Sequence, residues 1–272
     1  MLLTRGWGGR IRRIPSHVRP RRFRLFGLGD AKTGTERLAH KFSRYRSVHE
    51  WDRSRLVPAS SAVLEGRLPV SQVRTELRRR SRWHTFELDC AYFLAPFAGE
   101  LAEMHDDAQF VLLVRDCFSW LEARVDYVRR VPLTPVGRES MAARYGHYDE
   151  PLRGEEAALH DAGLYPITSY LRYWAELPAK VMRDVPADRL CIVRTDDLDQ
   201  SNERLASFVG IDPANLLPAP AVDDEPRNGL LATVPDESIV ELAVQHCAPL
   251  MQRFWGDDWV SLQSRLRPPP ST

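Results

Sequence analysis

The sequence is poor in cysteine and has no pattern of metal ligands. Its 272 residues contain 4 cysteines and 8 histidines, and none of them forms a C-x-x-C pair or a cluster at metal-ligand spacing. Three of the cysteines lie in apolar surroundings, which is typical of small core residues. We therefore expect no metal site.

Long apolar runs and a strong overall charge are also missing. No stretch approaches the roughly 20 apolar residues of a membrane span, and the N-terminus lacks the apolar core of a signal peptide. We therefore expect a soluble, cytoplasmic protein without a membrane partner. The formal net charge of +1 gives no global field that would attract nucleic acid.

Acidic residues are absent from the N-terminal segment. Residues 1–24 contain eight arginines, and the first carboxylate of the chain is Asp30. We expect residues 1–22 to form a basic arm. Such an arm is more typical of a disordered or surface-packed terminus than of a contact with nucleic acid or anionic lipid.

Strand-like and helix-like segments alternate along the rest of the chain. The clearest strand is residues 110–114, a continuous apolar run of the kind that is buried on both faces of a parallel sheet. Further strands are expected at residues 23–28, 46–50, 83–88 and 190–193. Helices are expected around residues 38–42 and at residues 71–82, 90–104, 117–130, 167–185, 203–209 and 236–254.

This alternation predicts one α/β domain over residues 23–260, with a parallel sheet flanked by helices on both faces and ligands at the carboxyl ends of its strands. Residues 131–164 are long, polar and rich in proline and glycine, so we expect a lid or an acceptor loop there. Residues 261–272 are expected to form a C-terminal tail. The oligomeric state stays open, with a homo-oligomer as one option.

Residues 23–42, FRLFGLGDAKTGTERLAHKF, predict a strand, a glycine-bearing loop and a helix. The first N–H groups of a helix have no internal partner and the helix dipole places partial positive charge there, so such a loop is an anion site. Lys32, Thr33, Gly34 and Thr35 lie at its mouth. The lysine adds a mobile charge, the hydroxyls add donors, and the glycine lets the backbone approach an oxyanion closely.

Two common nucleotide-binding patterns do not fit this loop. The nucleoside-triphosphate loop G-x-x-x-x-G-K-[ST] would need glycine in place of Phe26 and Ala31. The dinucleotide fingerprint G-x-G-x-x-G begins with Gly27 and Gly29 but meets Lys32 at its third glycine. The loop therefore matches neither pattern.

Residues 29–35, GDAKTGT, resemble the 5′-phosphosulfate loop of the sulfotransferases that use 3′-phosphoadenosine 5′-phosphosulfate (PAPS), a strand followed by G-x-x-[KR]-[ST]-G-[ST] at the start of a helix. Residues 111–120 resemble the family's second signature, a strand ending in Arg and a helix with Ser eight residues later, which together hold the 3′-phosphate. Arg115 is present, but the eighth residue is Ala123, which departs from the pattern. Ser119 lies one turn nearer on the same helical stripe and is the candidate replacement.

The resemblance extends to the later part of the chain. Residues 188–198 and 205–211 look like the family's late segment, a strand, a T-x-D-L-like turn and a short helix ending in F-[LV]-G. The three blocks occur in the family's order. Sulfotransferases often close the nucleotide with a basic, glycine-containing loop, and Arg227 in residues 226–229 is the candidate for it.

The resemblance implies a P-loop-like sulfotransferase fold and the transfer of a sulfuryl group from PAPS to a hydroxyl, or less readily an amine, of a small molecule. The product would be adenosine 3′,5′-bisphosphate. Lys32 would neutralise the bridging oxygen as its bond to sulfur breaks, so no metal is needed. The implied cofactor-binding residues of the loop are Asp30, Ala31, Lys32, Thr33, Gly34, Thr35 and Glu36. A secondary metabolite or another small alcohol or phenol is the expected acceptor.

A general base is expected at the end of the second strand, where His49 and Glu50 are the nearest titratable side chains in chain order. Successive strand residues point to opposite faces, so only one of the two can face the site. We favour Glu50, since a carboxylate suits a pocket rich in Lys and Arg. The alternative is that Glu50 merely pairs with an arginine such as Arg46 or Arg53.

Two other classes of function remain open. A phosphotransferase or NTPase would use the same strand, loop and helix, but it would need Mg²⁺ ligands beside the loop, where Asp116 is the only obvious acid. A non-catalytic nucleic-acid-binding module would use the basic arm. That hypothesis leaves Lys32 and Arg115 unexplained.

Overall fold

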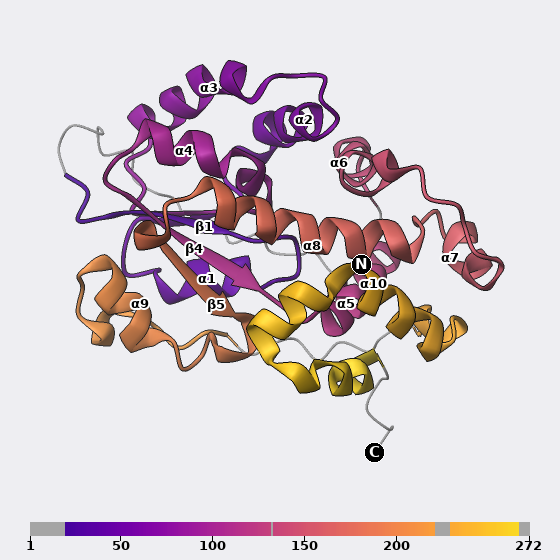
Figure 1. Ribbon diagram of the computed structural model, residues 1–272. Coiled ribbons are helices and arrows are strands. Elements are labelled where there is room, and N and C mark those ends of the chain that lie inside the picture. Colours follow the sequence, from indigo (N-terminus) through magenta and orange to yellow (C-terminus); the bar gives the residue numbers. More distant parts are fainter. Residues whose placement is uncertain (1–19, 132, 221–228, 267–272) are drawn as a thin grey trace, which may run out of the picture.

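The computed structural model describes residues 20–131, 133–220 and 229–266. Its centre is a five-stranded, wholly parallel sheet in the order β2-β3-β1-β4-β5 (Figure 1). The strands are β1 Arg24–Leu28, β2 Ser47–His49, β3 Leu88–Cys90, β4 Ala108–Val114 and β5 Leu190–Arg194. The predicted parallel α/β fold is confirmed.

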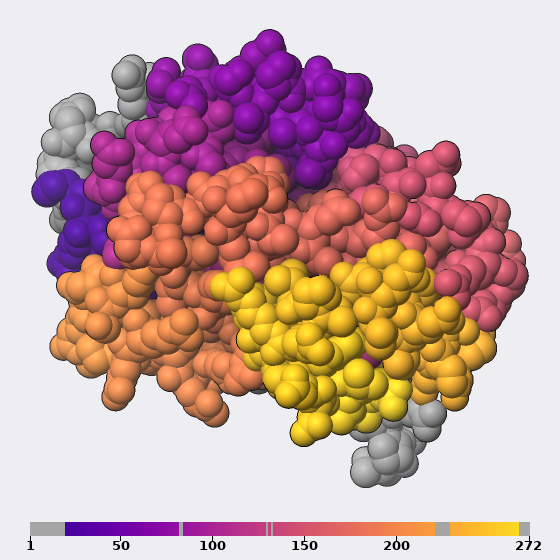
Figure 2. All heavy atoms as spheres, in the orientation of Figure 1, coloured from indigo at the N-terminus to yellow at the C-terminus, as the bar shows by residue number. Residues whose placement is uncertain are grey.

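Helices cover both faces of the sheet, as Figure 1 shows. The α-helices are α1 Thr35–Lys41, α2 Arg53–Leu64, α3 Val70–Trp83, α4 Ala98–Met104, α5 Cys117–Arg130, α6 Pro135–Tyr145, α7 Ala157–Asp161, α8 Ile167–Asp184, α9 Asn202–Val209 and α10 Asp236–Trp255. Long 3₁₀ segments occur at η1 Tyr92–Phe97 and η8 Asp257–Leu266, and shorter ones, such as η5 Thr195–Asp197, join other elements. On the face seen in Figure 2, the surfaces of α8 and α10 lie against each other.

The pleat of β1 and β4 divides the apolar side chains between two cores. Phe26 and Leu112 belong to the larger core, together with residues of α2, α3, α4, α5, α8 and α10. Leu25 and Val111 belong to the smaller core with α1 and α9. Because full burial of each such side chain contributes roughly 1.5–3 kcal/mol, a strand that is apolar on both faces is fixed at the centre of the sheet.

The third strand lies later in the chain than the sequence indicated. A strand over residues 83–88 is wrong, because α3 continues to Trp83 and β3 begins at Leu88. The acidic Asp89 lies within β3, where it is 6% exposed and forms a two-bond ion pair with Arg80, at 2.6 and 2.7 Å. The expected helix over residues 90–104 also begins as the 3₁₀ segment η1, and α4 starts only at Ala98.

Three helices, α6, α7 and α2, occur where none was predicted. Residues 131–164 contain α6 and α7 instead of a wholly irregular loop. Thr134 Oγ1 caps α6 by accepting a hydrogen bond from the Gly137 amide at 3.1 Å, and Pro135 occupies the first turn, which is a favourable start for a helix. The other helix, α2, packs against α6 and includes Pro58 in its interior. Burial of Leu56 and Val57 offsets the unfavourable proline.

Candidate active site

The loop between β1 and α1 has a backbone conformation that depends on glycine. Gly29 has φ 154° and Gly34 has φ 97°. A Cβ atom on Gly29 would lie 2.4 Å from Thr33 Oγ1 and 2.9 Å from the Leu113 carbonyl oxygen, so no larger residue fits there. Lys32 itself has φ 75°, a left-handed conformation that costs a non-glycine residue about 1–3 kcal/mol. Strain of this kind concentrates at functional sites.

Side chains from α5 and η5 bind the carbonyl oxygens of the loop. Trp120 Nε1 donates to the Ala31 oxygen at 3.0 Å, and Thr195 Oγ1 donates to the Thr33 oxygen at 2.7 Å. A trans peptide points its N–H away from its carbonyl oxygen. The amides of Lys32 and Gly34 share these two peptide planes, so they point away from Trp120 and Thr195.

Some amides of the loop lack an acceptor in the described part of the chain. Within the three described ranges, the N–H groups of Lys32, Gly34 and Thr35 donate to no acceptor, whereas the Thr33 amide donates to the Asp30 oxygen at 3.2 Å. Successive free N–H groups in a loop of mixed handedness form an anion-binding concavity. The loop backbone therefore has the form that an anion site requires, and the site itself stays a prediction.

Positive charge is concentrated around the ammonium group of Lys32. Its Nζ atom lies 3.9 Å from the ring centroid of Tyr127 on α5. Burial lowers the pKa of Lys32, and the nearby guanidinium groups of Arg130, Arg124 and Arg115 lower it further. A bound anion would relieve this repulsion, which is the electrostatic signature expected of a phosphate or sulfate site.

Arg115 and Ser119 lie together beside the loop. Arg115 Nε donates to Ser119 Oγ at 2.9 Å, and Arg115 Nη1 donates to the Lys32 carbonyl oxygen at 3.2 Å. Asp116 caps α5 by accepting from the Ser119 amide at 2.9 Å and also accepts from the Ser119 hydroxyl. The segment of residues 111–120 therefore contacts the loop of residues 29–35. The Ser119 hydroxyl lies next to Arg115, even though position 123 is alanine.

Asp30 has a different side-chain environment from the one expected of a cofactor-binding residue. Its carboxylate is buried, accepting from Arg144 Nη1 at 2.8 Å and from the Tyr145 hydroxyl at 3.2 Å. Both partners come from α6, which sequence reasoning missed. Any contact of Asp30 with a nucleotide would therefore use its backbone. Glu36 is exposed in the first turn of α1, and Arg227 lies outside the described residues.

His49 and Glu50 do not alternate across a strand. The strand β2 ends at His49, and Glu50 adopts a left-handed φ of 49°, so the argument that only one of them can face the site is wrong. His49 Nε2 lies 3.0 Å from Thr35 Oγ1 and 3.9 Å from Glu50 Oε1, while Glu50 Oε2 accepts from Arg53 at 3.3 Å. Of the two, His49 is the side chain that touches the loop. Burial lowers the pKa of His49, and Glu50 partly opposes this.

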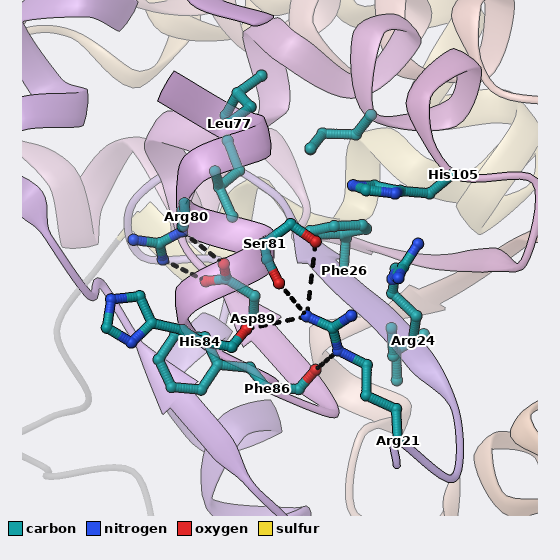
Figure 3. Close-up of a pocket in the computed structure, with 13 residues that line it drawn as sticks. Arg21, Arg24, Phe26, Leu77, Arg80, Ser81, His84, Phe86, Asp89 and His105 are labelled. Carbon is teal, nitrogen blue, oxygen red and sulfur yellow. Dashed lines mark hydrogen bonds and ion pairs between the residues drawn. The ribbon is translucent and has the colours of Figure 1, made fainter. Parts of the chain in front are cut away.

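A pocket elsewhere in the molecule contains none of the predicted site residues. Figure 3 shows this pocket near the start of β1, lined by Arg21, Arg24 and His105 among others. Arg21 donates to the backbone oxygens of Ser81, His84 and Phe86 at 2.7–2.9 Å. Burial and the neighbouring Arg24 lower the pKa of Arg21 to about 10. These bonds attach the segment before β1 to the end of α3, so the pocket has a structural explanation.

The described residues contain neither a cluster of metal ligands nor a membrane-spanning helix. No group of three or more histidine, cysteine, aspartate or glutamate side chains in that part of the chain is arranged to hold a metal ion. None of its helices is long and apolar enough to cross a membrane.

The fold is similar to that of a solved sulfotransferase. No protein-family model and no curated protein sequence matches this chain. The solved structure of a sulfotransferase from Alicyclobacillus acidocaldarius superposes with a TM-score of 0.51 at 15% sequence identity, covering 92% of this chain and 99% of that one. The sulfotransferase domain from the Synechococcus PCC 7002 olefin synthase reaches a TM-score of only 0.39 at 13% identity, over 93% and 91% of the two chains, and carries no weight here.

Proposed function

We propose that the protein is a PAPS-dependent sulfotransferase that moves a sulfuryl group to the hydroxyl of a small molecule. The observation that carries the proposal is the loop of residues 29–35. Its Lys32 and its free amides follow the end of β1 in a parallel sheet similar to that of a solved sulfotransferase, and Arg115 binds the Lys32 carbonyl oxygen.

In this proposal the loop binds the 5′-phosphosulfate. The free N–H groups of Lys32, Gly34 and Thr35 donate to its oxygens. The Lys32 ammonium group stabilises the charge that develops on the leaving oxygen as the bond to sulfur breaks. Loss of one such preorganised donor commonly lowers kcat by roughly 10²–10³. Arg115, oriented by Ser119, binds the 3′-phosphate through a charged hydrogen bond.

His49 and Glu50 are proposed to handle the acceptor's proton. The contact between His49 and Thr35 reverses our preference from the sequence, so His49 takes the proton and the Glu50 carboxylate stabilises the resulting imidazolium. With its pKa lowered by burial, His49 is neutral at pH 7 and able to accept a proton.

The Lys32 ammonium group lies against the ring of Tyr127 in this structure. Catalysis therefore requires the lysine side chain to turn toward the sulfur once the donor is bound.

The phosphotransferase alternative is weakened by the surroundings of Asp116. This side chain is fully buried and already accepts hydrogen bonds from Ser119 and Arg265. A Mg²⁺ ligand beside the loop would need oxygen atoms available to the metal. The acceptor class, a secondary metabolite or another small alcohol or phenol, and a cytoplasmic location stay predictions.

A thermal-shift panel without metal tests the proposed donor. Adenosine 3′,5′-bisphosphate with EDTA, ATP with Mg²⁺, and a DNA or RNA oligomer are compared at equal concentration. A ligand at 100 times its Kd stabilises the fold by about 2.7 kcal/mol. For a domain of this size that raises Tm by roughly 5–10 °C. We expect the shift with the bisphosphate alone. A shift only with ATP and Mg²⁺, or only with the oligomer, would overturn the proposal.

A further inference from the structure

The C-terminal segment η8 sends one arginine into the neighbourhood of the proposed nucleotide site. Arg265 Nη1 donates to Asp116 Oδ2 at 2.6 Å and to Asp196 Oδ2 at 2.8 Å. Asp116 follows β4, and Asp196 lies in η5 directly after β5. Arg265 therefore joins the carboxyl ends of two neighbouring strands. In Figure 2 the C-terminal surface, in yellow, adjoins the orange surface that includes the segment after β5.

A continuous path of hydrogen bonds leads from Arg265 to the loop. The Ser119 hydroxyl has a single proton, which it donates to Asp116, so it offers a lone pair to Arg115 Nε at 2.9 Å. Arg115 in turn donates to the Lys32 carbonyl oxygen at 3.2 Å. The orientation of Arg115 thus depends on Asp116 through one hydroxyl group.

Arg265 supplies the positive charge that balances the buried Asp116 carboxylate in this path of hydrogen bonds. Asp116 is 0% exposed, and its remaining contacts named above, the Ser119 amide and hydroxyl, are neutral. A buried carboxylate without a cation is costly. It would also repel a phosphate bound at the adjacent Arg115. The guanidinium of Arg265 offsets both effects, and its pKa is raised by Asp196 and Asp116.

The position of Arg265 is fixed by apolar contacts on each side of it in the sequence. Trp259 is 3% exposed and stacks on Phe118 of α5, with ring centroids 5.9 Å apart. Leu266 is 4% exposed. The segment η8 therefore packs on α5 as part of the domain, and this packing delivers Arg265 to Asp116.

We propose that Arg265 is a positioning residue for the nucleotide site, which it organises through Asp116, Ser119 and Arg115. This inference rests on the proposed function, because it names what orients the arginine that binds the 3′-phosphate. It assigns a role to residues 257–266, of which the last six were expected to belong to a tail.

Titration calorimetry with adenosine 3′,5′-bisphosphate on the full chain tests the inference. We expect Arg265→Ala to weaken binding by roughly 10- to 100-fold, the usual effect of losing a hydrogen bond to a charged group. The matched control is Arg253→Ala, since Arg253 is exposed on the preceding helix and contacts the Phe254 ring. That control should bind as the wild type does.

A double variant separates positioning from general destabilisation. In an Asp116→Asn background the charge that Arg265 balances is gone, so adding Arg265→Ala should change Kd less than threefold. Should Arg265→Ala fail to fold, Arg265→Lys replaces it, with an intermediate loss of affinity expected.

The outcomes are distinguishable. Wild type that fails to bind the bisphosphate contradicts the proposed function. Wild type that binds, together with an Arg265→Ala or Arg265→Lys variant of unchanged affinity, overturns the role of Arg265 and leaves the proposed function standing. Equal losses from Arg265→Ala in the presence and absence of Asp116→Asn would also overturn it.

Discussion

The ion pair between Asp30 and Arg144 should be one of the most sensitive contacts in the protein. The two side chains are 5% and 4% exposed and lie 2.8 Å apart. Arg144→Met keeps most of the buried volume but leaves the Asp30 carboxylate with the Tyr145 hydroxyl as its remaining α6 partner. Removing one member of a buried pair costs roughly 3–5 kcal/mol. At roughly 2–4 °C per kcal/mol, Tm should fall by about 6–20 °C.

A double-mutant cycle isolates the pair from the packing of the arginine stem. Asp30→Asn combined with Arg144→Met removes both charges of the pair, so the double variant should recover at least about 2 kcal/mol relative to the sum of the two single losses. Urea denaturation measures each free energy of unfolding. The control is Arg138→Met on the same helix, since Arg138 is exposed and its loss should cost under about 0.5 kcal/mol. An Arg144→Met loss no larger than that of Arg138→Met would refute the reasoning.

Three further predictions concern the proposed chemistry. Arg115→Ala should weaken bisphosphate binding far more than Ser119→Ala in calorimetry, because a charged contact exceeds a neutral hydrogen bond; equal effects would place the 3′-phosphate elsewhere. His49→Gln should lower kcat by roughly 10²–10⁴, and Glu50→Gln should lower it by less; a larger loss from Glu50→Gln would exchange the two roles. For the wild type, kcat/KM should stay high at pH values below 6.5, the ordinary pKa of histidine, because burial lowers the pKa of His49 and keeps its imidazole unprotonated there. The chain has three lysines, so NMR of ¹³C-labelled lysine can follow each one. The pKa of Lys32 should rise when the bisphosphate binds, since a nearby anion favours the charged form. An unchanged pKa would mean that Lys32 does not lie near the bound phosphate.

Features of the site that depend on neighbouring residues were predictable from the sequence. The apolar run before Gly29, the glycines and the helical spacing after Thr35 lie within a few residues of one another, and they define the strand, the loop and the helix. Arg115 was singled out by the resemblance of residues 111–120 to the second sulfotransferase signature, in which a strand ends in Arg. The parallel sheet followed from the alternation of strands and helices.

Features that depend on distant partners were not predictable. Arg144 is 114 residues from Asp30 in the sequence, and Arg265 is 149 residues from Asp116. Hydrophobic periodicity carries no information on which buried charges will meet. The same cause misplaced β3, since Asp89 is acceptable in a buried strand only because Arg80 neutralises it.

The most direct test of the account is the transfer of radioactive sulfate from PAPS to a panel of simple phenols and alcohols, measured for wild type and Lys32→Ala in EDTA. We predict turnover by the wild type on at least one acceptor. In the folded Lys32→Ala variant we predict a loss of kcat of roughly 10²–10³. Equal turnover by the two proteins, or transfer that requires Mg²⁺, would contradict the account.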